Sequence, residues 1–256
     1  SWLNSLHNLK KIQEVGVWGN LESTIPPGPP QAWVSSLCGR NPGAFGFWDF
    51  LYRDNFSYFE RKQVNSAVID DRVDCLYKIL PEIGQKVAII GVPGIWPCPK
   101  ISAGYCISNY LNNNSKNNLI WPDNLHNVIK DLVGDYIFNV QEFYSNKKRL
   151  KTIYDIDTQR FSLIKHFIKD RKCDYVLGIL TGLKLLYNLE DDKQYEDVLK
   201  DYYFWIDKEI GKLIEELDGD TTLIIYSVYA TQKLKGRINI NELLIQNGYI
   251  TLKSYP

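Results

Sequence analysis

Three runs of apolar, β-branched residues alternate with amphipathic stretches, and this alternation most constrains the fold. The runs are KVAIIGVP (86–93), DYVLGIL (174–180) and TTLIIYSV (221–228). Strands that read as continuous apolar runs are buried on both faces, as in a parallel sheet covered by helices. The stretches 3–14, 146–172 and 194–219 carry the helical period. The sequence therefore predicts an α/β fold with a mostly parallel central sheet and helices on both faces.

Shorter signals predict the remaining elements. Residues 17–25 resemble a strand, and the prolines 29 and 30 suit the first turn of a helix that runs to Gly39. Residues 71–84 and 239–250 predict two further helices, the first ended or kinked by Pro81 and the second capped at Gly248. Residues 94–106 look irregular and 112–118 form an Asn-rich loop. We expect one domain over 1–256, with an irregular, Asn-rich excursion near 94–121.

Charge and cysteine content limit the partners and the compartment. Lys plus Arg and Asp plus Glu balance at 30 each, which gives no electrostatic basis for binding nucleic acid or an anionic membrane. No secretory leader begins the sequence, and no apolar run reaches the roughly 18 residues of a membrane span. The five cysteines are scattered and form no C-x-x-C pair. These observations predict a cytoplasmic protein with reduced thiols, and no pattern assigns an oligomeric state.

Ligands of a parallel sheet bind beyond the carboxyl ends of its strands, where a metallohydrolase needs Asp, Glu or His. Three strand ends can be identified, after 25, 180 and 227. Their polar side chains are Gln31, Ser35 and Ser36 at the first end, Thr181, Lys184 and Asn188 at the second, and Ser227 and Tyr229 at the third. None of these is a carboxylate or a histidine. His7, His126 and His166 lie elsewhere, and Cys38 is either a nucleophile or, more commonly for such a residue, a buried core cysteine.

The segment GVWGNLESTIPPGPPQAWVSSLCGRNPGAFGFWDF (16–50) resembles the signature of the alkaline phosphatase superfamily, in its type I phosphodiesterase/nucleotide pyrophosphatase branch. In that family the stretch usually reads Ser-Thr-Ile-Pro-Pro-x-Thr-x-Pro-Ala-Trp-Thr-Ser, followed by Thr-Gly-x-Asn-Pro-Gly-x-His-Gly. The likeness continues through 86–99, 160–182, 202–227 and 234–250, which is almost the whole chain in order. It implies an alkaline-phosphatase-like fold and a hydrolase with two zinc or manganese ions around a Thr or Ser nucleophile.

We carried the family's site residues over to this sequence position by position. The matching residues lack the atoms that the resemblance predicts for the nucleophile and the metal ligands. The nucleophile falls on Pro29, and the His of the Pro-Gly-x-His-Gly turn falls on Phe45. The two metal-binding pairs fall on Gly182 with Leu186, or Lys184 with Asn188 in a register two residues later, and on Val228 with Tyr229. The first metal Asp would precede residue 1 and the last His would follow residue 256, so we expect a fold that is incomplete at both ends.

Three functions remain open from the sequence. The first is a family member without metal cofactors, which either binds a small molecule in a relined cleft or acts as a pseudoenzyme or scaffold. The cleft would be lined by Pro29, Gln31, Cys38, Phe45, Gly182, Leu186, Val228 and Tyr229. The second is a metal-free enzyme in which Tyr229 and Lys184 act as general acid and base and Cys38 as a nucleophile. The third is a metal-dependent phosphodiesterase whose ligands lie outside this sequence.

Overall fold

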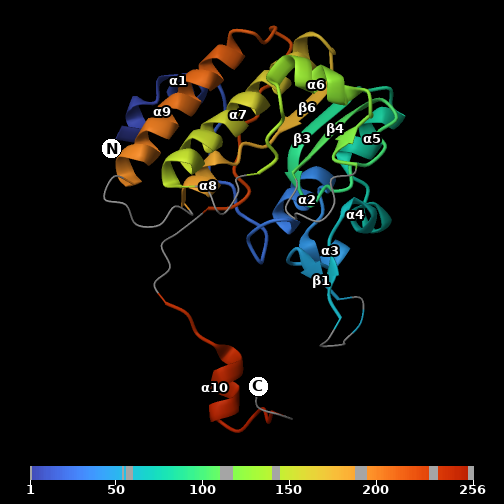
Figure 1. The fold of residues 1–256 in the computed structure, drawn as a ribbon, viewed down its shortest axis with the longest axis vertical. Coiled ribbons are helices and arrows are strands. Elements are labelled where there is room, and N and C mark those ends of the chain that lie inside the picture. The colour runs from blue at the N-terminus through green and yellow to red at the C-terminus, as the bar shows by residue number, and fades with distance from the viewer. Residues whose placement is uncertain are drawn as a thin grey trace.

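The computed structural model describes residues 2–53, 55, 60–109, 118–139, 145–187, 195–230 and 236–252. Its central feature is a four-stranded sheet in the order β5-β4-β3-β6 (Figure 1). The strands are β3 (Val87–Pro93), β4 (Gly104–Asn109), β5 (Ile120–Trp121) and β6 (Tyr175–Gly178). Strand β3 pairs in parallel with β4 and β6, and β5 pairs antiparallel with β4. The predicted α/β class is confirmed, with a sheet that is mixed.

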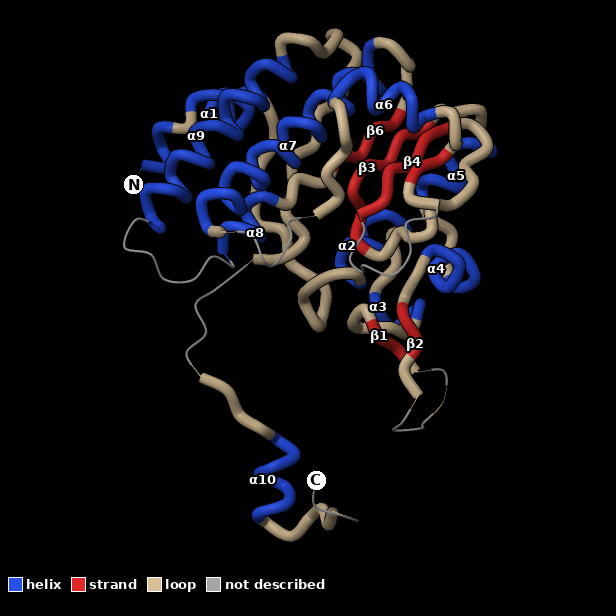
Figure 2. Tube along the Cα trace, viewed as in Figure 1, coloured by secondary structure: helices blue, strands red, loops and turns tan. Residues whose placement is uncertain are grey.

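Helices account for most of the remaining secondary structure (Figure 2). They are η1 (Trp2–Ser5), α1 (His7–Val15), α2 (Gln31–Cys38), α3 (Pro42–Phe45), α4 (Ser66–Arg72), α5 (Leu76–Glu82), α6 (Leu125–Val133), α7 (Asn146–Lys169), α8 (Gly182–Tyr187), α9 (Tyr195–Ile214) and α10 (Ile240–Gln246). A small antiparallel ribbon joins β1 (Leu51–Tyr52) to β2 (Lys62–Gln63). Figure 1 shows α10 apart from the sheet and its helices.

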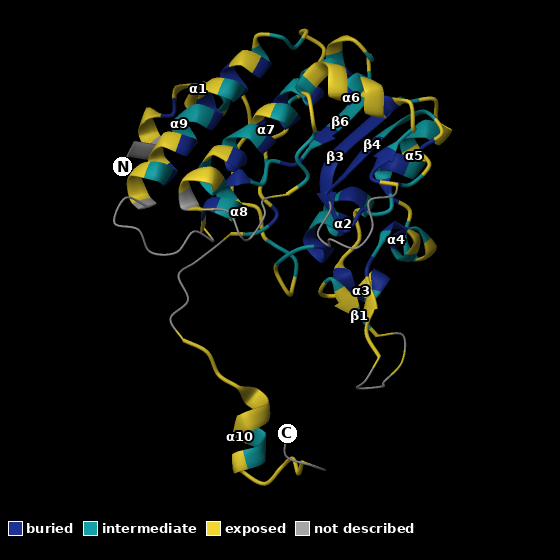
Figure 3. Ribbon diagram, viewed as in Figure 1, coloured by how far each residue is buried: buried dark blue, intermediate teal, exposed yellow. Residues whose placement is uncertain are grey.

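Strand β3 is buried along its whole length because helices cover both faces of the sheet (Figure 3). Successive side chains of a strand point to opposite faces. Val87 and Ile89 accordingly pack in a cluster with residues of α2, α4 and the start of α5. Ala88 and Ile90 pack in a second cluster, with residues of α6 and α7. The continuous apolar run is therefore explained by two cores, one on each side.

A third core lies between helices, where α1, α7, α8 and α9 meet. The apolar face predicted for 3–14 is confirmed there, since Leu6 is buried and Leu9 and Ile12 pack against this core. Asp207 of α9 is buried and accepts hydrogen bonds from the backbone N–H groups of Asn8 (3.1 Å) and Leu9 (2.8 Å). These N–H groups belong to the first turn of α1, which has no acceptor of its own, so α9 caps α1 from a distance.

Several sequence predictions are confirmed. Helix α2 follows the prolines 29 and 30 and ends at Gly39, whose φ of 64° is the left-handed conformation that glycine adopts at such ends. The predicted strands at 86–93 and 174–180 are β3 and β6. The stretches 146–172, 194–219 and 239–250 contain α7, α9 and α10.

The strands predicted at 17–25 and 221–228 are wrong, because both segments are irregular. Val17 is fully exposed, Ile25 is 89% exposed and Ile224 is 72% exposed. A strand is stabilised by hydrogen bonds and side-chain contacts to a neighbouring strand. In the described residues, neither segment pairs with another strand, so apolar, β-branched composition alone does not make either one a strand.

Two other predictions require correction. The helix predicted over 71–84 is split between α4 and α5, because Val73 is extended (φ −148°, ψ 147°) and Cys75 precedes a new helix start.

The stretch 94–121, predicted as irregular, contributes β4 and β5 to the main sheet. Gly104, Ser108 and Asn109 dilute the apolar pattern of β4, yet Ser108 is buried and its hydroxyl donates to the Ile95 carbonyl at 2.8 Å. Residues 112–117 of the Asn-rich loop lie outside the described residues.

The sequence predicts no membrane-spanning segment, and the described helices can be compared with this prediction. Among the described helices, none combines the length and the apolar character needed to cross a bilayer. The prediction of a single domain over 1–256 stays a prediction.

Gly104 provides a test of the packing between β3 and β4. A Cβ atom at this position would lie 2.3 Å from the Val87 carbonyl oxygen and 2.8 Å from Ile101 Cγ2. Because the Val87 oxygen belongs to the backbone of a buried strand, Gly104→Ala is expected to lower the free energy of unfolding by about 1–3 kcal/mol. Urea denaturation measures this loss. Gly219→Ala is the control, since no atom lies within 4 Å of that Cβ, and an equal loss in both variants would contradict the packing described.

Candidate functional site

The segment before α2 holds the position that the resemblance assigns to the nucleophile. Pro29 is half-buried and has no hydroxyl, and Gln31 begins α2 with 2% of its surface exposed. The Gln31 amide nitrogen donates to the Pro26 carbonyl at 3.3 Å, whereas its Oε1 is buried without a partner. One turn later the Ser35 Oγ is also buried without a partner. Residues four apart share a helix face, so α2 presents two unpaired polar atoms on one face.

The second strand end is shaped by a buried ion pair. Asp157 and Arg160, one turn apart on α7, have side chains exposed by 0% and 1%, and Arg160 Nη1 lies 3.4 Å from Asp157 Oδ1. Arg160 also donates to the Ile179 carbonyl (2.8 Å) and to the Thr181 hydroxyl (2.7 Å). Asp157 accepts from the backbone N–H groups of Thr181 (3.2 Å) and Gly182 (2.9 Å). The pair therefore fixes the chain that leaves β6.

Tyr202 of α9 completes this network by donating its hydroxyl to Asp157 Oδ2. Burial and the neighbouring charge of Asp157 raise the pKa of Tyr202 well above its ordinary value. The phenol consequently stays protonated and remains a hydrogen-bond donor at neutral pH.

Gly182, which falls where the family would place a metal-binding Asp, has no room for a side chain. A Cβ atom built on it would lie 1.8 Å from the Tyr202 hydroxyl oxygen and 2.7 Å from Asp157 Oδ2. Leu186, one turn later on α8, is completely buried in the core between α7, α8 and α9. Both positions therefore contribute to helix packing.

The third strand end lies against α2. The Ser23 hydroxyl donates to the Val228 carbonyl at 2.6 Å, and the Tyr226 hydroxyl donates to Ser36 Oγ at 3.3 Å. The rings of Tyr226 and Trp33 are 6.1 Å apart. Burial raises the pKa of Tyr229, and a hydrogen bond with Trp33 opposes this rise. The structure thus brings the first and third predicted strand ends together at α2, although neither is preceded by a strand.

The other predicted site residues are placed differently. Phe45 of α3 is buried against Phe47, with ring centroids 4.5 Å apart, in the core beneath α2. Lys184 is exposed on α8, where partial desolvation lowers its pKa. Cys38 is half-buried at the end of α2. Asn188 lies outside the described residues.

The sequence analysis did not predict the buried polar network of Asp157, Arg160 and Tyr202. A signal was available, because Asp157 and Arg160 lie among the apolar buried residues Ile153, Ile156 and Phe161 of α7. Charged residues are almost never fully buried unless they are paired. An Asp and an Arg one turn apart on an apolar helix face therefore indicate a buried pair.

Within the described ranges, no group of three or more His, Cys, Asp or Glu side chains is placed to hold a metal ion. His166 instead lies 2.7 Å from Asp170, one turn away along α7.

Comparison with known proteins identifies the family. A family model described as type I phosphodiesterase / nucleotide pyrophosphatase matches residues 1–255. The chain belongs to this family. Searches of curated proteins and of solved structures returned no match.

The resemblance implies two metal ions, and the residues that it predicts at the nucleophile and ligand positions do not have the chemistry to hold them. Pro29, Phe45, Gly182, Leu186 and Val228 have no side-chain donor atom, and Tyr229 has a phenol whose raised pKa opposes the anionic form that binds a cation.

The buried pair provides a test of the network at β6. Asp157→Asn removes the charge that compensates Arg160 and is expected to cost about 3–5 kcal/mol of unfolding free energy, because the guanidinium stays buried. Chemical denaturation followed by circular dichroism measures the loss.

The matched control is Asp74→Asn, which removes one partner of the ion pair with Lys78; the two side chains are 79% and 37% exposed. An exposed pair contributes about 1 kcal/mol or less. Equal losses in the two variants would contradict a structural role for the Asp157–Arg160 pair.

Proposed function

We propose that this protein is a member of the type I phosphodiesterase/nucleotide pyrophosphatase family without the two-metal phosphoesterase site. It acts as a non-catalytic protein whose relined cleft beside α2 binds a small, uncharged molecule. The observation that carries the proposal is the crowding at Gly182, where Tyr202 and Asp157 occupy the space that a metal-ligating side chain would need.

The chemistry of α2 supports an uncharged ligand. Buried polar atoms are nearly always hydrogen-bonded in folded proteins, and an unpaired one costs roughly 1–3 kcal/mol. Gln31 Oε1 accepts hydrogen bonds only, and Ser35 Oγ can accept or donate. A ligand that carries an N–H or O–H group beside a small apolar body would pair both atoms, and the apolar side chains of Pro29 and Val228 suit such a body.

A metal-free enzyme that uses Tyr229 and Lys184 receives less support. Burial raises the pKa of Tyr229 and so moves it away from the range in which a phenol exchanges protons at neutral pH. Lys184 is exposed on α8, whereas Tyr229 is hydrogen-bonded beside α2.

Several parts of the proposal rest on sequence alone. Balanced charge supports a partner that is neither nucleic acid nor membrane, and scattered cysteines support a cytoplasmic location. We further propose that residues 1–256 form one alkaline-phosphatase-like domain.

The first test concerns metal and turnover. The purified full chain is expected to hold no stoichiometric zinc or manganese by elemental analysis, and to leave bis(p-nitrophenyl) phosphate intact when either metal is added. A metal-dependent phosphodiesterase processed in parallel is the positive control. Two metal ions per chain together with metal-dependent turnover would overturn the proposal.

The second test concerns the ligand. Small amides and alcohols screened by thermal shift should include compounds that raise the melting temperature of the wild-type protein, because a ligand that binds only the folded state stabilises it. Gln31→Leu should lose this shift, since it removes the buried acceptor. Ser162→Ala, which removes an exposed hydroxyl of α7, should keep it. Equal shifts in both variants would place the binding away from α2.

A further inference from the structure

The end of α7 carries a chain of three hydrogen-bonded side chains that the proposed ligand site does not use. His166 Nδ1 lies 2.7 Å from Asp170 Oδ2, and His166 Nε2 lies 3.1 Å from Arg171 Nε. The backbone N–H groups of Asp170 and Arg171 both donate to the His166 carbonyl, at 2.9 and 3.1 Å. The turn after α7 therefore holds a carboxylate at one nitrogen of the imidazole ring and a guanidinium at the other.

These two partners determine which ring nitrogen carries the proton. A guanidinium has donors and no acceptor, so His166 Nε2 must accept the hydrogen bond from Arg171 Nε. A neutral imidazole has one N–H group, which therefore lies on Nδ1 and donates to the Asp170 carboxylate. The two hydrogen bonds together require a neutral ring in the Nδ1–H form.

Proton uptake by the ring disrupts one side of this chain. An imidazolium carries N–H groups on both nitrogens, so Nε2 can no longer accept from Arg171. The positive charges of His166 and Arg171 also repel each other across the 3.1 Å between their nitrogens. The contact with Asp170 is kept and becomes an ion pair.

Arg171 also connects the end of α7 to the sheet. Its carbonyl accepts from Lys86 Nζ at 2.7 Å, and its guanidinium lies 5.8 Å from the centre of the Tyr105 ring in β4. Lys86 directly precedes β3, and its backbone N–H donates to Asp174 Oδ2 at 2.7 Å, just before β6. A change at Arg171 is therefore felt at the amino ends of three strands.

The other charged groups around this end of α7 are paired or exposed. Lys165 and Lys169 of α7 form ion pairs with Glu216, which follows α9, at 3.2 and 3.1 Å. Helix α6 packs on α7 through apolar side chains, and its charged residues Lys130 and Asp131 are exposed, as is Lys172 in the turn before β6.

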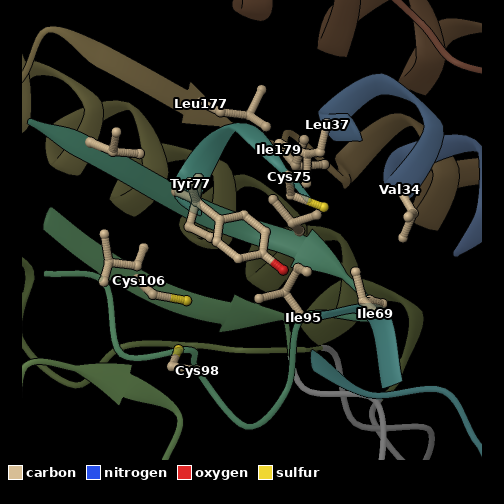
Figure 4. Close-up of a cluster of buried hydrophobic side chains, with 14 of the residues drawn as sticks. Val34, Leu37, Ile69, Cys75, Tyr77, Ile95, Cys98, Cys106, Leu177 and Ile179 are labelled. Atoms are coloured by element: carbon tan, nitrogen blue, oxygen red, sulfur yellow. The ribbon is translucent and has the colours of Figure 1, made fainter. Parts of the chain in front are cut away.

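Titratable groups other than His166 do not change charge in the same pH range. Burial is the main cause that raises the pKa of the Cys173 thiol to about 11, so this thiol stays neutral in acid and near neutrality. Cys75, Tyr77, Cys98 and Cys106 lie in the core on the face of the sheet opposite α7 (Figure 4). We therefore assign a response to mild acid at this end of α7 to His166.

We propose that Asp170, His166 and Arg171 form a pH-sensitive latch at the amino ends of the central strands. Histidine is the side chain whose charge ordinarily changes between about pH 5 and pH 8. At the upper end of this range the neutral ring holds the Arg171 side chain, and at the lower end the charged ring releases it. The inference does not depend on the proposed ligand or on the absence of metals.

The test is a pH titration of the ¹⁵N-labelled full chain by NMR, from about pH 8 to about pH 5. Long-range ¹H–¹⁵N spectra of the imidazole rings should show neutral His166 as the Nδ1–H form. His126, exposed on α6, is the internal control and should show the Nε2–H form that free imidazole side chains prefer. As His166 gains its proton, the Arg171 Nε–H signal should shift with the same midpoint. Its heteronuclear NOE should fall, because the released side chain moves faster.

Two variants assign the response to the ring. His166→Phe removes both nitrogens and should leave the Arg171 Nε–H signal unchanged over this pH range. His126→Phe, the matched control, should keep the response of the wild type.

Either of two results in the wild type would overturn the proposal, even where a variant fails to fold. One is a neutral His166 in the Nε2–H form. The other is an Arg171 Nε–H signal that stays in place while His166 gains its proton. An equal Arg171 response in His166→Phe would overturn it as well.

Discussion

The buried carboxylate of Asp157 is the constraint on which the arrangement around β6 depends. A charge with no access to water must be compensated by an opposite charge and by hydrogen bonds. Asp157 obtains both from Arg160, from the backbone N–H groups of Thr181 and Gly182, and from the Tyr202 hydroxyl. These partners come from α7, from the chain after β6 and from α9. One carboxylate therefore determines where the chain goes at the carboxyl end of β6, and how α9 approaches it.

The Asp157 network occupies the place after β6 at which the resemblance to the family predicts a metal-binding side chain. The family match covers nearly the whole chain, whereas Gly182, at which the sequence resemblance predicts a metal-binding Asp, lies in a tightly packed network. Two buried polar atoms without partners lie on α2, at Gln31 and Ser35, whereas Arg160 Nε is an unpartnered atom inside the network itself. We therefore propose binding beside α2, because function follows the chemistry of the site and not the fold alone.

Much of the fold was predictable from sequence, and the exceptions share a cause. Strand β3 is fully buried between two layers of helices, so its continuous apolar run predicts it correctly. Residues 221–228 have the same composition without a pairing partner among the described residues, and composition does not reveal a partner. Strand β4 was missed because Gly104 looks like a turn, although it allows close approach to the Val87 carbonyl. The identities of Pro29 and Gly182 were readable from the sequence, but the crowding at Gly182 was not, since Asp157 and Tyr202 are distant along the chain.

The free energy of unfolding of Gly182→Ala tests the central claim most directly. If Tyr202 and Asp157 occupy the space beside this glycine, even a methyl group forces them apart, and the variant should lose about 1–3 kcal/mol relative to wild type. A variant as stable as wild type would contradict the account, because it would show that a side chain fits at Gly182, the position at which the resemblance predicts a metal ligand.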